Sequence, residues 1–221
     1  MKKWLILSVV CAVLLAGGYV LIDYYTGNHV EIEDVFDSTT LQVGDQIPNE
    51  QLDKTWNIDS QSKVYLSITT SNEPVNMAFK GVRGNWEINT GDPAKMYATA
   101  VVDIKGLDSG IAKRDEHVEK ADLLDATQFP TAEFKLSEVK QWPKEVLEGK
   151  PVNIQMAGTL KVKGIEKAVV FDCEALYEKG QMKLKGTTVV TFADFGIKNP
   201  SSAVATIEDN IIVNLQLVLG S

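Results

Sequence analysis

The feature that most limits the folds open to this chain is an alternation of apolar and polar residues that recurs after residue 55. A period of two is typical of β-strands that bury one face, because successive side chains of a strand point to opposite sides. Residues 152–162 show the alternation most clearly, and residues 207–219 repeat it, with Ile212 and Val218 as exceptions. The pattern therefore predicts strands over most of the chain.

Six further segments have the composition of strands, which brings the expected number to about eight. They are residues 64–71, 75–90, 96–105, 131–139, 168–177 and 182–192. Only residues 112–126 break the pattern, with an apolar face suited to a short helix. So few helices cannot supply the crossovers of a parallel sheet. We therefore expect an all-β fold, an antiparallel barrel or sandwich with one helical insertion.

The segment 75–90 changes the phase of its alternation. Apolar residues stand at odd positions before Gly81 and at even positions after Gly84. A shift of one residue turns the apolar side chains to the other face of a strand. We predict a bulge or sharp bend at these glycines, as the closing of a barrel often requires.

The amino terminus carries an apolar segment of a different kind. Residues 4–22 contain no charged side chain, which is close to the length of about 20 residues that an α-helix needs to cross a bilayer. Lys2 and Lys3 precede this segment and Asp23 follows it, so residues 1–22 are predicted to be a transmembrane signal-anchor with a cytoplasmic amino terminus. The alternative is a signal peptide cleaved near Gly18, followed by secretion. Both interpretations place the rest of the chain outside the cytoplasm.

The two cysteines have different predicted roles. Cys11 lies in the apolar segment, and the Val10 before it fits a lipoprotein cleavage site poorly, so we expect it to be an apolar helix residue. Cys173 is then the single cysteine of the exported part, which excludes a disulfide within the domain.

An acidic linker is expected between the anchor and the strands. Residues 23–54 contain eight acidic residues against Lys54 alone, which predicts an extended, self-repelling segment with at most one short strand near residues 41–47. Fully extended, this linker would reach about 100 Å. The folded domain is expected at residues 55–221.

The charge and the residue types of the chain argue against several functions. Its net charge of -8 makes nucleic-acid binding a poor hypothesis. One His in the domain and one Cys argue against a transition-metal site by ligand count, and no cofactor is expected. Arg114, Asp115 and His117 form the densest polar cluster, but no nucleophile or oxyanion partner accompanies them. We therefore expect no catalytic residues, and a role for this cluster in structure or at the mouth of a binding site.

Five motifs, in register over about 165 residues, resemble the YceI-like, polyisoprenoid-binding family. They are Trp56-Asn-Ile-Asp-Ser60, Asp108-Ser-Gly110 with Arg114-Asp-x-His117, Ala121-Asp-Leu-Leu-Asp-Ala126 with Phe129-Pro130 and Phe134, Gly158-x-Leu-x-Val162-x-Gly164-Ile-x-Lys167, and Asp194-Phe-Gly-Ile197. The resemblance implies an extended, eight-stranded, lipocalin-like antiparallel barrel in the bacterial periplasm or cell exterior. It also implies a hydrophobic tunnel for a long-chain amphiphile, such as a polyisoprenoid, an isoprenoid quinone precursor or a fatty-acid derivative.

The candidate site follows from combining the alternation with the resemblance. Arg114, Asp115 and His117 are the candidate polar residues at the mouth. The candidate lining residues are Phe79, Trp86, Met156, Leu160, Phe171, Phe192, Val213 and Leu215. The same side chains could also pack into a solid core, because bulky and small inward residues alternate.

Two positions depart from the family pattern. Leu123-Leu124 stands where the family often has a Phe pair, which changes an apolar wall. Phe192-Ala193 stands where an Arg commonly precedes the Asp-Phe-Gly turn, which removes a charged partner for a ligand head.

Three functions remain open at this point: an amphiphile carrier, an enzyme acting on such a lipid through Asp115 and His117, and an envelope stress or structural module with a filled barrel. A homodimer is compatible with the apolar residues expected on the outer face, which are Val170, Leu176, Ile212 and Val218.

Overall fold

The computed structural model describes residues 27–36, 43–71, 73–202 and 205–221. The predicted signal-anchor at residues 1–22 lies outside the described residues. Within the described ranges, no helix combines the length and the apolar character that a membrane crossing requires.

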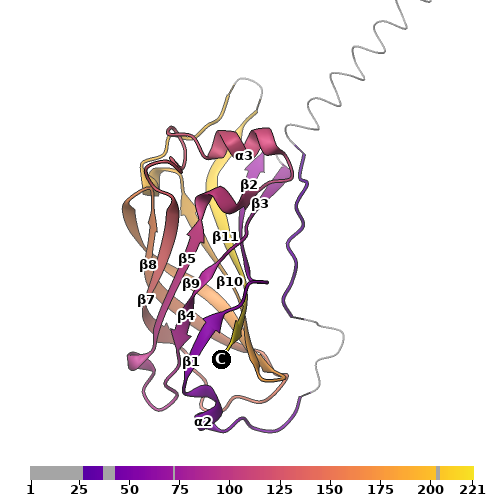
Figure 1. Ribbon diagram of the computed structural model, residues 1–221, viewed down its shortest axis with the longest axis vertical. Helices are drawn as coiled ribbons and strands as arrows, with labels where there is room; N and C mark the ends of the chain where they lie inside the picture. Colours follow the sequence, from indigo (N-terminus) through magenta and orange to yellow (C-terminus); the bar gives the residue numbers. More distant parts are fainter. Residues whose placement is uncertain (1–26, 37–42, 72, 203–204) are drawn as a thin grey trace, which may run out of the picture.

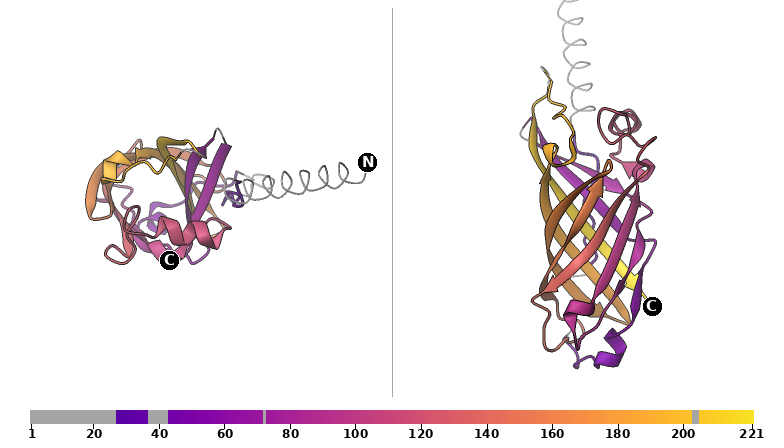
Figure 2. Two further views of the ribbon diagram at one scale, coloured as in Figure 1. Left: turned by 90° about the horizontal axis from the view of Figure 1, so that it is seen from above. Right: turned by 90° about the vertical axis from the view of Figure 1, so that its left-hand side faces the viewer.

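Eight strands close into an antiparallel barrel, as the alternation and the resemblance predicted (Figures 1 and 2). In spatial order they are β1 (Thr55–Ile58), β4 (Arg83–Glu87), β5 (Tyr97–Asp103), β7 (Thr131–Lys140), β8 (Val152–Val162), β9 (Ile165–Glu178), β10 (Gln181–Thr191) and β11 (Ile207–Gly220). Pairing of β1 with β11, with Ile58 opposite Leu219, closes the ring.

Three further strands extend one half of the wall. β2 (Lys63–Thr70) pairs with β11 above β1, β3 (Glu73–Phe79) pairs with β2, and β6 (Leu107–Asp108) pairs with β3. The predicted strand at residues 75–90 is thus two strands, β3 and β4. The break falls at residues 80–82, where Gly81 has a φ of 75°, so the phase change marked a real interruption.

Helical segments lie at the two ends of the barrel. They are α2 (Asn49–Leu52), the 3₁₀ turns η1 (Pro93–Lys95), η2 (Ile104–Gly106) and η3 (Ala193–Phe195), and α3 (Ala112–Val118). Of the helix predicted at residues 112–126, only the first half is helical. After α3 the amide of Leu124 bonds back to the carbonyl of Val118, and Asp125 adopts a φ of 51°, so the chain folds into turns. We call the end of the barrel that carries α3 the open end, and α2 lies at the other end (Figure 1).

Aromatic packing fills the end opposite α3. The Trp56 side chain is fully buried, and its indole donates a hydrogen bond to the carbonyl of Leu52 at 3.0 Å. Trp86 packs edge-on against Trp142, with ring centroids 5.8 Å apart. Leu52 and Ile47, which the sequence assigned to the linker, belong to the main core. The predicted strand at 41–47 is a single bridge between Gln46 and Leu147, with residues 41 and 42 outside the described ranges.

Residues 27–36 lie along the outside of the barrel, and we call this segment the strap (Figure 1). The amide of Val35 donates to the side chain of Gln216 at 3.0 Å, and Asn76 donates to the carbonyl of Val30 at 2.9 Å. Two of its acidic residues form ion pairs with lysines of the barrel: Glu33 with Lys63 at 2.6 Å and Asp34 with Lys185 at 3.3 Å. A free, self-repelling linker was therefore the wrong expectation for this part, because Glu33 and Asp34 are paired and the segment is hydrogen-bonded to the barrel.

The outer face beside the strap is also less exposed than predicted. Leu176 and Val218 point outward by the alternation, yet they are 0% and 4% exposed. Both pair with Lys183. Two residues further along β10, Lys185 pairs with Gln216, whose side chain binds the strap. These two residues are therefore buried and do not contribute to the exposed apolar surface that the sequence predicted, whereas Val170 and Ile212 are exposed.

Candidate ligand-binding site

An apolar cavity of about 710 Å³ occupies the open end, and we call it the upper cavity. Ligand sites of small molecules commonly measure about 300–1,000 Å³. Its walls come from the inward rows of β2, β3 and β11, from α3 and the turns after it, and from the segment that follows β10. The lining residues are Leu66, Ile68, Thr70, Val75, Met77, Arg114, His117, Val118, Leu123, Leu124, Phe192, Ile197, Pro200, Ala205, Ile207 and Ile211. Leu66 and Ile68 point inward but are only half-buried, because they face this space.

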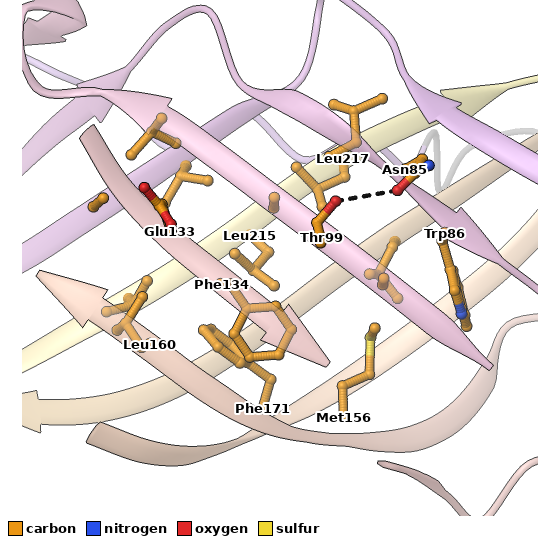
Figure 3. A pocket seen from close by; sticks show the side chains of 18 of the residues that line it. Asn85, Trp86, Thr99, Glu133, Phe134, Met156, Leu160, Phe171, Leu215 and Leu217 are labelled. Carbon is orange, nitrogen blue, oxygen red and sulfur yellow. Dashed lines mark hydrogen bonds between the residues drawn. The ribbon is translucent and has the colours of Figure 1, made fainter. Parts of the chain in front are cut away.

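A second, smaller space of about 80 Å³ lies deeper in the barrel, and we call it the inner cavity (Figure 3). This is room for only a few water molecules. The rings of Phe134 and Phe171 meet edge-on inside it, with centroids 5.4 Å apart. The two cavities adjoin, since Val213 of the inner cavity pairs directly with Leu66 of the upper one.

Gly158 determines where the Phe134 ring can lie. A side chain at this position would place its Cβ 2.5 Å from the Phe134 ring and 2.4 Å from the carbonyl of Lys135. The missing side chain therefore lets Phe134 turn across the barrel toward Phe171, and the inner cavity stays small because of this aromatic pair.

The predicted lining residues divide between the two cavities. The inner cavity is lined by Trp86, Met156, Leu160, Phe171, Val213 and Leu215, and the upper cavity by Phe192. Phe79 is 3% exposed, belongs to the main core and lines neither cavity. Most of the upper cavity was missed. The alternation of Leu66 and Ile68 could have shown two of its residues, but the positions of Leu124 and Pro200 depend on turns that carry no periodic signal.

Arg114 lies at the mouth of the upper cavity and binds two backbone carbonyls. Its guanidinium donates to the carbonyl of Ser109 at 2.7 Å and to the carbonyl of Gly27 at 3.2 Å. Its Nε is buried and has no hydrogen-bond partner among the described residues. Burial lowers the pKa of Arg114, and the neighbouring charge of Asp115 opposes that shift. The upper cavity is therefore bordered by a cation, which suits a polar or anionic ligand group.

Asp115 has a structural role instead. Its carboxylate accepts hydrogen bonds from the backbone amide of Ser109, at 2.9 Å, and from the Ser109 hydroxyl. His117 lines the upper cavity and Asp115 does not, and within the described residues no hydrogen bond joins the two. Among these residues no group of three or more His, Cys, Asp or Glu is arranged to hold a metal ion. The predicted polar trio is thus split between the cavity wall and the support of α3.

Two of the sequence motifs meet in an ion pair. Lys167 of β9 contacts Asp194 of η3 at 2.5 Å, and Asp194 also accepts a hydrogen bond from the amide of Thr191 at 2.9 Å. The Lys167 hydrogen bond is the main reason that the pKa of Asp194 is lowered, and the Thr191 amide adds to it. This pair fixes the chain that carries Phe192 and Ile197 into the upper cavity.

The fold and its cavities define a closed, lipocalin-like antiparallel barrel with an apolar chamber at one end. The YceI-like domain model matches residues 56–219, and the chain belongs to this family.

Sequence relatives include a UPF0312 protein of Vibrio cholerae, 34% identical over 116 residues, or 48% of this chain and 58% of the relative. The chain thus spans less than two thirds of the length of that relative. A UPF0312 protein of Pseudomonas putida is 32% identical over 147 residues, which are 61% of this chain and 70% of the relative.

Solved structures share the fold at low sequence identity. BcnA of Burkholderia cenocepacia has a TM-score of 0.62 at 20% identity, covering 73% of this chain and 98% of that one. A polyisoprenoid-binding domain from Saccharophagus degradans, implicated in plant cell wall breakdown, has a TM-score of 0.63 at 12% identity and covers 75% and 98%.

Proposed function

We propose that this protein binds a long-chain amphiphile, such as a polyisoprenoid, an isoprenoid quinone precursor or a fatty-acid derivative, in the upper cavity. The observation that carries the proposal is the chemistry of this cavity. Among its described lining residues Arg114 and His117 are the only titratable ones, and almost all the others are apolar. Each CH₂ group removed from water contributes about 0.8 kcal/mol, so a tail can bind firmly without hydrogen bonds. The ligand head then lies near Arg114.

Binding, rather than catalysis, is the role that these residues support. Asp115 accepts two hydrogen bonds from Ser109 and, within the described residues, makes none to His117, so it does not orient His117 as a general base. The name of the Saccharophagus degradans domain, which shares this fold, adds support for an isoprenoid ligand.

The second candidate is an envelope stress or structural module with a filled barrel. The small inner cavity favours it, because side chains occupy most of the space at that level. The upper cavity favours the carrier. A ligand that enters only the upper cavity reconciles both observations, since the tail would then stop at the Phe134–Phe171 pair.

The protein is further proposed to act in the bacterial cell envelope, outside the cytoplasm. Residues 1–22 would anchor it in the cytoplasmic membrane, with secretion after cleavage near Gly18 as the alternative. Flotation of the full chain with membranes, together with the mass of its mature amino terminus, distinguishes these two outcomes.

Native mass spectrometry of protein purified without detergent tests the ligand directly. We expect a bound amphiphile, and we expect Ile211→Glu to abolish its retention, because this side chain lines the upper cavity. Val43→Glu is the control, since this apolar side chain is 62% exposed and lines neither cavity. Protein that is uniformly free of lipid and also rejects added quinones and fatty amides would overturn the proposal.

A homodimer is also proposed, through the outer faces of β9, β10 and β11. Val170, Val189 and Ile212 are 44%, 57% and 42% exposed there, and Val189 pairs directly with Ile212. Sedimentation of the wild type and of Val189→Lys would test it, with a monomeric wild type as the contrary result.

A further inference from the structure

We propose that the open end of the barrel docks against the bilayer that holds the amino-terminal segment, so that the amphiphile passes directly between the bilayer and the upper cavity. This inference rests on the membrane anchor included in the proposed function. It adds which face of the domain meets the lipid and what keeps it there.

The strap begins at the mouth of the upper cavity. Gly27 accepts its hydrogen bond from Arg114, which lines that cavity, and the side chain of Asn28 accepts one from the amide of Asn76 in β3, at 3.0 Å. His29 packs closely on Gly110: a Cβ atom added to Gly110 would lie 2.6 Å from the Cβ of His29. Figure 1 shows the strap starting level with α3 and running down the barrel.

The chain between the apolar amino-terminal segment and the strap is short. The apolar segment ends at Ile22, five residue steps before Gly27, and five extended residues span at most about 17 Å. A free linker from Asp23 to the first strand would reach about 100 Å. Because the strap is fixed to the barrel, the mouth stays within about 17 Å of the membrane-spanning segment. The opposite end lies a full strand away, since the 14 residues of β9 correspond to about 45 Å of chain.

The rim of the open end is compatible with lipid but does not select it by charge. Exposed Lys113, Lys120 and Lys198 are offset by exposed Glu116, Asp122 and Glu208. The turn between β8 and β9 presents Ile165, which is 42% exposed and suited to the bilayer interface. The anchor and the fixed strap, rather than anionic lipid, would therefore direct the docking.

The orientation can be measured with two matched labels on the full chain in lipid vesicles. Lys163 and Lys179 each precede a glycine in a two-residue turn, with φ of 51° and 50°, and they lie at the open end and at the opposite end. In a Cys11→Ser background, Lys163→Cys and Lys179→Cys would each carry a fluorophore, quenched by nitroxides on lipid head groups. We expect clear quenching at position 163 and little at 179. Equal quenching, or stronger quenching at 179, overturns the proposal, as does protein that does not float with the vesicles.

The short connection can be tested by lengthening it. Twenty Gly and Ser residues inserted between Thr26 and Gly27 extend the link from about 5 to about 25 residues, which lowers the effective concentration of the mouth at the bilayer about tenfold. We expect the transfer of a fluorescent fatty acid out of the vesicles to slow by a similar factor. The same insertion between residues 39 and 40 leaves the strap in place and should have no effect. Unchanged transfer with the first insertion would contradict direct exchange.

These measurements separate the inference from the function on which it rests. Quenching reports the orientation of the barrel whether or not a lipid is bound. Binding of the fatty acid by detergent-solubilised protein reports the ligand function whatever the orientation. Protein that binds the fatty acid but shows equal quenching at both ends has the function without the docking.

Discussion

The guanidinium of Arg114 donates a hydrogen bond to the carbonyl of Gly27 at 3.2 Å, although 87 residues separate them in the sequence. The same side chain lines the upper cavity. One cation therefore joins the wall of the candidate binding site to the start of the strap, and it connects the ligand site with the segment that follows the proposed anchor.

Replacement of Arg114 should release the start of the strap. Arg114→Met keeps an apolar stem in the cavity wall but loses the hydrogen bonds to Gly27 and Ser109. A hydrogen bond to a charged group contributes about 1.5–3 kcal/mol, so amide exchange within residues 27–31 should rise at least about tenfold by mass spectrometry. Lys120→Met, an exposed neighbour, serves as the control. Unchanged exchange would mean that the other contacts hold the strap alone.

Trimming the aromatic pair should lengthen the ligand that the barrel accepts. Phe171→Leu removes the ring that meets Phe134 and opens the inner cavity toward the upper one. The lipids retained by this variant should shift to longer chains in native mass spectra, with a cost in stability of about 1–2 kcal/mol. Phe36→Leu is the matched control, because this Phe is 6% exposed but lies in the strap. An unchanged distribution of chain lengths would place the ligand elsewhere.

The Lys167–Asp194 pair should make stability depend on acid pH. A carboxylate whose pKa is lowered in the folded state stabilises the protein above its unfolded pKa, near 3.8, and this stabilisation is lost as the pH falls through the folded pKa. Because Lys167 is 46% exposed, we expect Asp194→Asn to cost only about 1 kcal/mol at neutral pH. The difference from the wild type should shrink below about pH 4 in urea unfolding. A difference that grows toward low pH would be contrary to this assignment.

Cys173 should be chemically silent in the folded protein. Burial raises the pKa of its thiol from 9.0 to about 12, with a smaller contribution from Asp172, so almost no thiolate exists at neutral pH. In a Cys11→Ser variant, alkylation should proceed only through unfolding and at the unfolding rate. Because the unfolded thiol loses its proton first, this residue also lowers the stability of the fold as the pH rises above about 9. Rapid alkylation of native protein would show an accessible thiol.

The strands and their inward faces were predictable, because alternation is a local signal that burial of one face imposes. The predicted ends of β8, β10 and β11 lie within one or two residues of the observed ones. The short strands β1 and β6 were missed, since four residues and two residues are too few to show a period.

The candidate site was only partly predictable, since the inner cavity follows from alternation and the upper cavity does not. Six of the predicted lining residues come from regular strands and line the inner cavity. The larger space depends on α3, on the turn at Asp125 and on the segment fixed by Lys167 and Asp194. Contacts between residues that are distant in the sequence produce no periodic pattern in the sequence around either residue.

By itself, the sequence determined the strand pattern, the apolar amino-terminal segment and the acidity of residues 23–54. The tertiary structure decided what that acidity does, because only folding brings Lys63 and Lys185 to Glu33 and Asp34. A segment that would repel itself in isolation is held against the barrel once its charges find partners. Residues 27–36, which the sequence assigns to a linker with a reach of about 100 Å, are thereby fixed to the barrel, beginning at the mouth of the upper cavity.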